Sequence, residues 1–256
     1  MKKSALLAAP ALAMAVAALP ATPAAAADSW SFQAELAPVN NSTAAGSAVV
    51  DVTGQEATVT VEVAGAPALF QGAPYPHAQH IHIGGQGVCA PPTADADGDG
   101  AVSSMEGEPW TGAIGVSLTT AGDTTPASAV AVDRFPAGAA YTYQRTVPVD
   151  AATLEALQSG TAVVNVHGAD PAALSAAAQA KVNPMAPDLP LASDVPIACG
   201  VLAGSQMAVP EGPADTGVET AGTGSATNGL VGTAVLGVLV LGAAAAGLRR
   251  RAAGGR

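Results

Sequence analysis

Polar and apolar residues alternate along several short stretches of this chain, as they do in β-strands that bury one face. The alternation is unbroken over 56–63, where every second residue is alanine or valine. Residues 46–53 precede this stretch and Gly54 lies in the turn between them, so the two predict a β-hairpin. Stretches bounded by glycine and proline predict further strands at 30–36, 79–83, 113–119, 127–133, 141–147, 161–167 and 197–203.

Two short helices are predicted between the later strands. Asp150 is typical of an N-cap, and the helix that follows it reaches Gln158 and is closed by Gly160. Asp170 and Pro171 stand in the favoured order of N-cap and first helical residue, which predicts a second helix over 172–182. Many short strands with few helices predict an all-β fold, namely an antiparallel, Greek-key-like sandwich or barrel.

The first 27 residues have the pattern of a secretory signal peptide. Lys2 and Lys3 form a basic start, 4–19 is apolar, and alanines precede Asp28. The alternative, a retained membrane helix, is disfavoured because the apolar run is short and ends near Pro20. The protein is therefore expected to be exported.

A second apolar run lies near the other end, where 229–248 carries no charge. Its length suits a bilayer core about 30 Å thick, so it predicts one C-terminal transmembrane helix. Arginines at 249–251 follow directly and predict that the tail, 249–256, is cytoplasmic. The domain at 28–208 would then lie on the extracellular face, joined to the membrane by a Gly- and Thr-rich stalk at 209–228.

The stalk also contains Pro213-Ala214-Asp215-Thr216-Gly217, which resembles the sorting signal that sortases cleave between Thr and Gly. Pro213 stands where the usual motif has leucine. Anchoring by the membrane span is therefore the preferred interpretation, and attachment to the cell wall is the alternative.

The exported part is strongly acidic. All 20 acidic residues of the chain lie in 28–228, against three basic ones, Arg134, Arg145 and Lys181, which gives a formal charge of −17. Such a surface repels nucleic acid and anionic headgroups and favours cations, although solubility outside the cell explains much of it. We expect no nucleic-acid partner.

Cys89 and Cys199 are the only cysteines, and in an exported chain they are expected to pair.

Three of the four histidines lie within six residues, in His77-Ala-Gln-His80-Ile-His82. On a strand, His80 and His82 point to the same side, about 7 Å apart along the backbone, and could share one ion. His167, at the end of another predicted strand, is the remaining histidine and the candidate third ligand. His77 is either a fourth ligand or a loop cap. Imidazole is typical of copper and zinc sites; the alternative is a buried, hydrogen-bonded pair.

These segments carry a family resemblance. QHIHIGGQGVC, VVNVHGAD and IACGVLAG resemble segments of copper-zinc superoxide dismutases. FQAELAPVNNSTAAGSAVVDV, with AQHIHIG and VVNVHG, is more similar to the chordin-type CHRD domain, a β-sandwich of related shape. The resemblance covers most of 30–204. It implies His80, His82 and His167 as copper-type ligands and a Cys89–Cys199 disulfide.

The departures from a dismutase bear on function. No histidine lies between His82 and His167, so the zinc ligands of a dismutase are missing. The arginine that guides superoxide before the last cysteine is also missing, and Asp194 stands in that region. With the acidic surface, superoxide would be steered away. Dismutase activity is therefore expected only if the protein is a copper-only variant of the enzyme that uses His77.

An acidic segment follows Cys89 and matches the calcium-loop template D-x-D-x-D-G-x5-E at every position. The predicted ligands are Asp95, Asp97, Asp99, Ala101 through its carbonyl, Ser103 through a water, and Glu106. Ala90, Pro91 and Pro92 exclude a helix before the loop, and only a short turn is expected after it, up to Pro109. The alternative is an acidic, solvated turn.

Together these patterns predict an exported, membrane-anchored, CHRD-like module that binds Ca²⁺ and copper and has a structural or binding role at the cell surface. The membrane and components of the cell envelope are its expected partners. The alternative is a copper-only oxidoreductase of the superoxide dismutase type. Copper storage is disfavoured because the chain has only five methionines, which are scattered.

Overall fold

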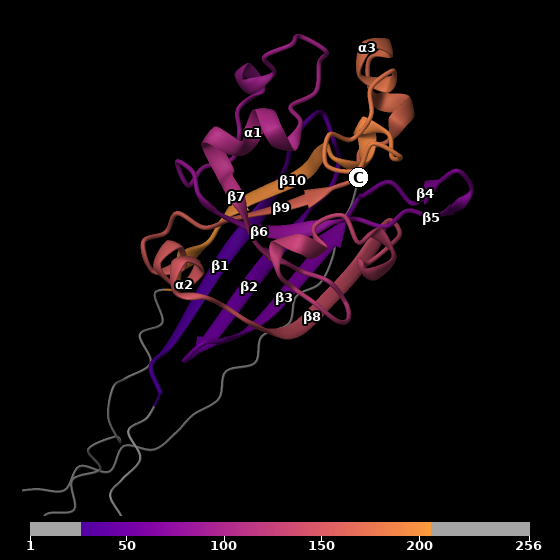
Figure 1. Cartoon of the computed structure of the whole chain (residues 1–256). Coiled ribbons are helices and arrows are strands. Elements are labelled where there is room, and N and C mark those ends of the chain that lie inside the picture. The colour runs from indigo at the N-terminus through magenta and orange to yellow at the C-terminus, as the bar shows by residue number, and fades with distance from the viewer. Residues whose placement is uncertain (1–26, 206–256) are drawn as a thin grey trace, which may run out of the picture. The chain divides into compact units, whose positions relative to one another are not determined.

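A computed structural model describes residues 27–205. All but the last residue of the predicted signal peptide, and the whole of the predicted stalk, transmembrane helix and basic tail, lie outside these residues. Within them, the fold is a strongly curled antiparallel sheet of nine strands with few helices, which confirms the all-β prediction (Figure 1). No helix within 27–205 has the length and apolarity needed to cross a membrane.

The strands follow the order β7-β6-β9-β10-β1-β2-β3-β8, and β11 pairs with β1. Their bounds are β1 Ser29–Pro38, β2 Ala45–Thr53, β3 Glu56–Ala64, β6 Gln79–Gly84, β7 Gly112–Ser117, β8 Ala140–Pro148, β9 Val163–His167, β10 Pro196–Val201 and β11 Ala203–Gly204. A separate two-stranded ribbon joins β4 (Leu69–Phe70) to β5 (Ala73–Pro74). β1 pairs with β2 along most of its length and with β10 at its end, so it connects the two halves of the curled sheet.

The hairpin predicted from the alternation is present. β2 and β3 pair from Thr53 opposite Glu56 to Ala45 opposite Ala64, and Gly54 in the turn has a φ of 62°. Val50, Val52, Val59, Val61 and Val63 point inward and are buried, while Val49 and the polar residues between them face out. This is the expected outcome when one face of an antiparallel sheet covers the core.

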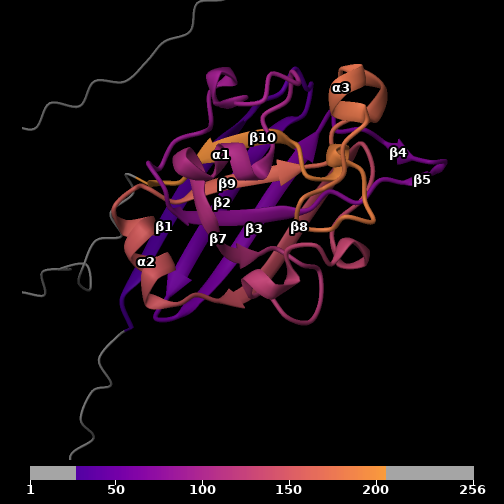
Figure 2. The same ribbon diagram turned by 45° about the horizontal axis from the view of Figure 1, so that its top comes forward.

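The other half of the sheet is buried on both faces. In β9 all five residues are buried, and in β6 the first four are. Two segments cover the second face of these strands. The segment after β6 contains α1, and the segment between β9 and β10 contains α3 (Figures 1 and 2). The Cys89–Cys199 disulfide fastens the first of these segments to β10, as predicted.

One predicted helix is confirmed and one is largely wrong. α2 is Ala151–Gln158, and the Asp150 side chain caps it by accepting a hydrogen bond from the Thr153 amide. The second prediction, 172–182, forms only a 3-10 turn at Pro171–Ala173 and the single turn α3 at Ala176–Gln179. Ser175 interrupts it because its hydroxyl accepts from the Ala178 amide and so begins a new helix there.

The structure also corrects two predictions around the metal motifs. The segment after the calcium-type loop is a helix, α1 (Ser104–Thr111), which continues through Pro109. Ser103 and Glu106 cap each other's backbone amides at its start, and this capping box stabilises the first turn. The strand predicted at 127–133 is wrong, since 3-10 turns form at Pro126–Ser128 and Val132–Arg134.

Side-chain hydrogen bonds explain the failed strand. The Asp123 carboxylate accepts from the hydroxyls of Thr125 and Ser128, and the Arg134 guanidinium donates to Ser128 and to the Asp123 carbonyl. These short-range bonds fold the segment on itself and compete with ladder pairing. The resulting turn places the Ala129 carbonyl against His80.

Candidate metal centres

His80, His82 and His167 converge, as predicted. One ring nitrogen of each lies within 4.8 Å of the others. The ring centroids are 5.1 Å apart between His80 and His167, 6.1 Å between His82 and His167, and 5.8 Å between His80 and His82. They meet because β6 pairs directly with β9, so the two strands bring the H-x-H pair and His167 to one place.

Each of the three imidazoles has one nitrogen bonded to a backbone carbonyl. His80 Nε2 is 3.1 Å from the Ala129 oxygen, His82 Nδ1 is 2.8 Å from that of Gly112, and His167 Nδ1 is 2.6 Å from that of Asp194. A carbonyl only accepts, so the bonded nitrogen of a neutral ring carries the proton and the other has a free lone pair. Such outer hydrogen bonds fix the tautomer of metal-binding histidines.

The second nitrogen of each ring is buried without a hydrogen-bond partner among the described residues: His80 Nδ1, His82 Nε2 and His167 Nε2. Buried polar atoms are normally paired, and leaving one unpaired costs about 1–3 kcal/mol. Three such atoms in one cluster are unusual. With metal–nitrogen bonds near 2 Å, three ligand nitrogens lie about 4 Å apart or less, so shifts below about 1 Å would bring them onto one ion.

Burial keeps these rings uncharged. Desolvation lowers the pKa of His82 and of His167 to about 4, and the charge of His167 also opposes protonation of His82. Desolvation lowers the pKa of His80 well below its usual value, with His167 and His82 adding to the effect. All three are therefore neutral near pH 7, the form in which imidazole binds a metal.

The structure does not bring His77 into this cluster, contrary to its prediction as a fourth ligand. His77 Nδ1 lies 2.9 Å from the His167 carbonyl and Nε2 lies 3.0 Å from that of Pro67. Its ring also stacks beside Tyr75 and Tyr141. Both nitrogens face carbonyls, one of which accepts the single N–H of the neutral ring, and His77 has the structural role of joining the 67–78 loop to the end of β9.

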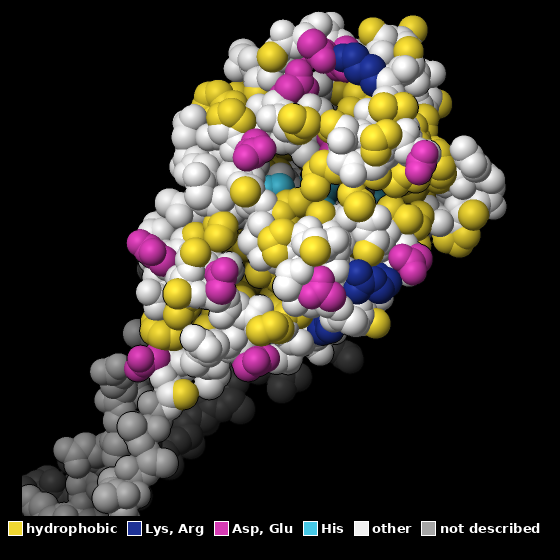
Figure 3. Space-filling model, viewed as in Figure 1, with side chains coloured by type: hydrophobic (Ala, Val, Ile, Leu, Met, Phe, Trp, Pro, Cys, Tyr) yellow, Lys and Arg dark blue, Asp and Glu magenta, His cyan; other side chains and the backbone are white. Residues whose placement is uncertain are grey.

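A small cavity of about 20 Å³ lies beside His80 and His167. It is lined also by Ser104, Asn183, Ser193 and Asp194. Figure 3 shows histidine atoms at the bottom of a narrow hollow in this face. A volume of this size holds about one water molecule, so any exogenous ligand at the cluster must be very small.

The second predicted centre, the acidic loop, is partly assembled. Carboxylate oxygens of Asp95, Asp97 and Asp99 lie within 4.8 Å of one another. The loop wraps around Asp95, whose two oxygens accept from the amides of Gly98, Asp99 and Gly100. Gly100 has a φ of 87°, which supplies the sharp turn that the template assigns to glycine.

The other predicted ligands lie beside this trio. The Glu106 carboxylate accepts from the amides of Ala96, Asp97 and Ser103 and from the Ser103 hydroxyl, so it is outside the cluster. Ser103 is the N-cap of α1. Ala101 is buried, and its amide donates to Asp99. Binding of Ca²⁺ by all predicted ligands would therefore require Glu106 to turn away from these amides.

A cation from elsewhere in the chain already contacts the loop. The Lys181 ammonium is 2.5 Å from Asp97 Oδ2 and 2.7 Å from Asp99 Oδ2. The hydrogen bond to Lys181 lowers the pKa of Asp97, and the two carboxylates raise that of Lys181. No sequence pattern predicted the pairing of Lys181, although it is the one lysine between 28 and 228.

The two centres are connected through the start of α1. The Ser104 amide donates to the Asp194 carboxylate and the Ser104 hydroxyl donates to the Asp194 carbonyl. The same carbonyl accepts from His167. On the loop side, the Asn40 carboxamide bonds to both the amide and the carbonyl of Val102 and to the carbonyl of Pro196. These contacts join the acidic loop to the strand that follows Asp194.

Sequence reasoning missed the groups that orient the histidines. Three of them are backbone carbonyls, which have no sequence signature, and Phe135 packs edge-on to His80 from the segment between the strands predicted at 127–133 and 141–147. The sequence did not indicate that the Asp194 carbonyl orients His167; Asp194 only stands in the region where a dismutase has an arginine.

Comparison of the chain with protein-family models, with curated proteins and with solved structures found no match.

Proposed function

We propose that the protein is a metal-binding module whose principal centre is formed by His80, His82 and His167. The observation that carries this proposal is the cluster of three buried, neutral imidazoles, each with one nitrogen bonded to a carbonyl and one without a partner within 27–205. A donor set of three imidazoles suits copper and zinc, and copper binds such sites more tightly in the divalent series. We therefore assign copper as its metal.

The resemblance to CHRD domains supports the same assignment, because it places these three histidines at the matching positions. The apolar segments at 4–19 and 229–248 support an exported module held at the cell surface by its C-terminal span. In this proposal the module has a structural or binding role in the cell envelope, and its acidic surface keeps nucleic acid and anionic ligands away.

The decisive measurement is metal binding by the purified full-length protein, with two histidine variants. His167→Gln should lower the affinity for Cu²⁺ by about 100-fold or more in a titration against a competing chelator, because it removes one of three ligands. His77→Gln is the matched control, since His77 is a buried histidine of the same region that lies outside the cluster. Equal loss in both variants, or no tight copper or zinc binding by the wild type, would refute the proposal.

Calcium binding at the acidic loop is the second part of the proposal. Asp95, Asp97 and Asp99 already lie together, and Glu106 is close enough in sequence to complete the twelve-residue template. The contact with Lys181 supports a preference for positive charge at this position. Outside a cell, where Ca²⁺ is plentiful, a site of this type needs a dissociation constant of only about 10⁻⁴–10⁻³ M.

A copper-only oxidoreductase is the alternative, and the small cavity beside His80 and His167 favours it because one water-sized substrate would fit there. Neither Lys nor Arg is among the residues that line the cavity, whereas Asp194 is. An anionic substrate such as superoxide would therefore meet no attractive charge. We expect the copper-loaded protein to remove superoxide no faster than the same copper held by a simple chelator complex. A clear excess, lost in His167→Gln, would favour the enzyme instead.

A further inference from the structure

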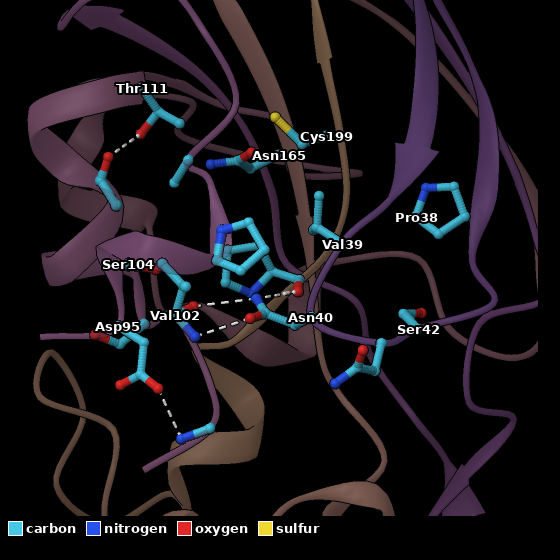
Figure 4. Close-up of a pocket in the computed structure, with 17 residues that line it drawn as sticks. Pro38, Val39, Asn40, Ser42, Asp95, Val102, Ser104, Thr111, Asn165 and Cys199 are labelled. Atoms are coloured by element: carbon cyan, nitrogen blue, oxygen red, sulfur yellow. Dashed lines mark hydrogen bonds between the residues drawn. The ribbon is translucent and has the colours of Figure 1, made fainter. Parts of the chain in front are cut away.

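A cavity of about 480 Å³ lies between the outer face of β9 and β10 and the layer that contains α1, and Asp95 and Ser103 of the acidic loop form part of its wall (Figure 4). Asn165 of β9 and Cys199 of β10 line it from the sheet, Pro38 and Asn40 from the end of β1 and the loop after it, and Thr111 from α1. Its volume lies in the range of about 300–1,000 Å³ that is typical of small-molecule sites. We call it the Asn165 pocket.

The Asn165 carboxamide is the notable group in this pocket. The residue is only 3% exposed, and its side chain makes no hydrogen bond with any described residue. In Figure 4 its amide nitrogen points away from Cys199, toward the side of α1. A carboxamide offers two donor hydrogens and an acceptor oxygen, and burying it without partners is unfavourable. Its polar atoms face the cavity, so a molecule bound there could pair with both the donor and the acceptor.

The other deep polar groups of the wall are already engaged. Asn40 bonds to Val102 and to the Pro196 carbonyl, and Asp95 accepts from amides of its own loop. The Thr111 hydroxyl donates to carbonyls of α1 and β7. Asn165 is thus the polar anchor, and prolines, Val39, Val102 and the disulfide make most of the remaining wall apolar.

These walls limit the chemistry of the ligand. The lining contains no Lys, Arg or His, and its single charge is the Asp95 carboxylate, so an anion is disfavoured. It contains no aromatic ring on which a sugar or a nucleobase could stack. A carboxamide pairs well with another amide, because each supplies a donor and an acceptor. We propose that this pocket binds an uncharged, aliphatic, amide-bearing molecule, with its amide on Asn165.

The test uses the ¹⁵N-labelled full-length protein without added metal, because Asp95 and Ser103 of the acidic loop border the pocket. The probe is N-acetyl-leucine methylamide, and N-acetyl-leucine, with the same body and a terminal carboxylate, is the charged control. The neutral probe should shift the side-chain NH₂ signals of Asn165, identified by their loss in Asn165→Leu. The charged compound should bind at least about tenfold more weakly.

Two variants separate a specific site from a general apolar surface. Asn165→Leu has nearly the same size and should weaken probe binding by at least about tenfold, because it removes the anchoring amide. Asn41→Leu, an exposed asparagine at the rim of the pocket, should leave binding almost unchanged. The Asn165→Leu protein must retain its dispersed spectrum and its disulfide. If the probe leaves the Asn165 signals unshifted, or binds both variants equally, the pocket holds water only and the proposal is wrong.

Discussion

Lys181 determines how the acidic loop responds to a free cation. Its ammonium contacts Asp97 and Asp99 at the third and fifth template positions, where Ca²⁺ would take carboxylate oxygens. The Lys181 side chain is 36% exposed, so the contact is a partly solvated ion pair that can be displaced. In the proposed site, Ca²⁺ and Lys181 would compete for the same oxygens.

Lys181→Gln should therefore raise the affinity for Ca²⁺ by about three- to tenfold, because it removes a solvated cation that contacts the same carboxylates. Isothermal titration of the full-length protein would measure this change. Arg145→Gln is the control, because it alters net charge equally but lies on β8 and bonds to carbonyls of the 119–122 turn. Equal gains in the two variants would show a general charge effect, and a loss in Lys181→Gln would show that Lys181 assists binding.

At the scale of elements, the acidic loop is held to the sheet by few contacts. Asn40 is the main one, since its carboxamide forms a pair of hydrogen bonds with the backbone of Val102 and a third with Pro196. The segment from Lys181 to Asp194 forms a second connection, because Lys181 contacts the loop and the Asp194 carbonyl contacts His167. A shift of either connection would move backbone that contacts the histidine cluster or lies next to it.

Asn40→Ala should lower the free energy of unfolding by about 2–3 kcal/mol more than Asn41→Ala, because it leaves the amide and carbonyl of Val102 unpaired. The pair is well matched: Asn40 and Asn41 have φ values of 52° and 57°, so both alanine variants bear the same backbone strain. Denaturant unfolding at fixed Ca²⁺ would measure the difference. Similar losses in the two variants would mean that backbone strain, not the loss of the hydrogen bonds to Val102, accounts for the effect.

At the scale of the whole molecule, buried neutral histidines make stability depend on pH. In the unfolded chain histidine has a pKa near 6.5, whereas burial lowers the pKa of His82 and His167 to about 4. Between these values the unfolded state binds more protons than the folded state, so the free energy of unfolding falls as the pH falls. Above about pH 6.5 both states are neutral and the histidines no longer favour unfolding.

The protein stripped of metal should thus lose on the order of several kcal/mol of stability between pH 6.5 and pH 4, since one pKa unit corresponds to about 1.4 kcal/mol. Denaturant midpoints at a series of pH values would show the slope. The combined variant with glutamine at 80, 82 and 167 should lose most of it. A similar slope in that variant would assign the acid sensitivity to other groups, first of all to the buried His77, whose pKa is also lowered by burial.

The sequence alone determined the features that depend on near neighbours. Alternation predicted the β2–β3 hairpin, Asp150 predicted the start of α2, and the spacing of Asp95, Asp97 and Asp99 placed three carboxylates around one turn. It failed at 127–133 because hydrogen bonds of Asp123 and Arg134 outweighed a weak strand pattern. The prediction of only a short turn after the loop was also wrong, because a capping box starts a helix there that continues through Pro109.

Only the tertiary structure decided what each functional side chain meets. His77 and His167 are both histidines of apolar segments, yet one has two carbonyl partners and the other keeps a free nitrogen beside His80 and His82. Lys181 reaches Asp97 across 84 residues of chain, and Asn165 is unpaired because a cavity faces it. The physical reason is the same in each case: periodicity and capping act within a few residues, whereas metal ligation, burial and pocket shape arise from contacts between segments far apart in the chain.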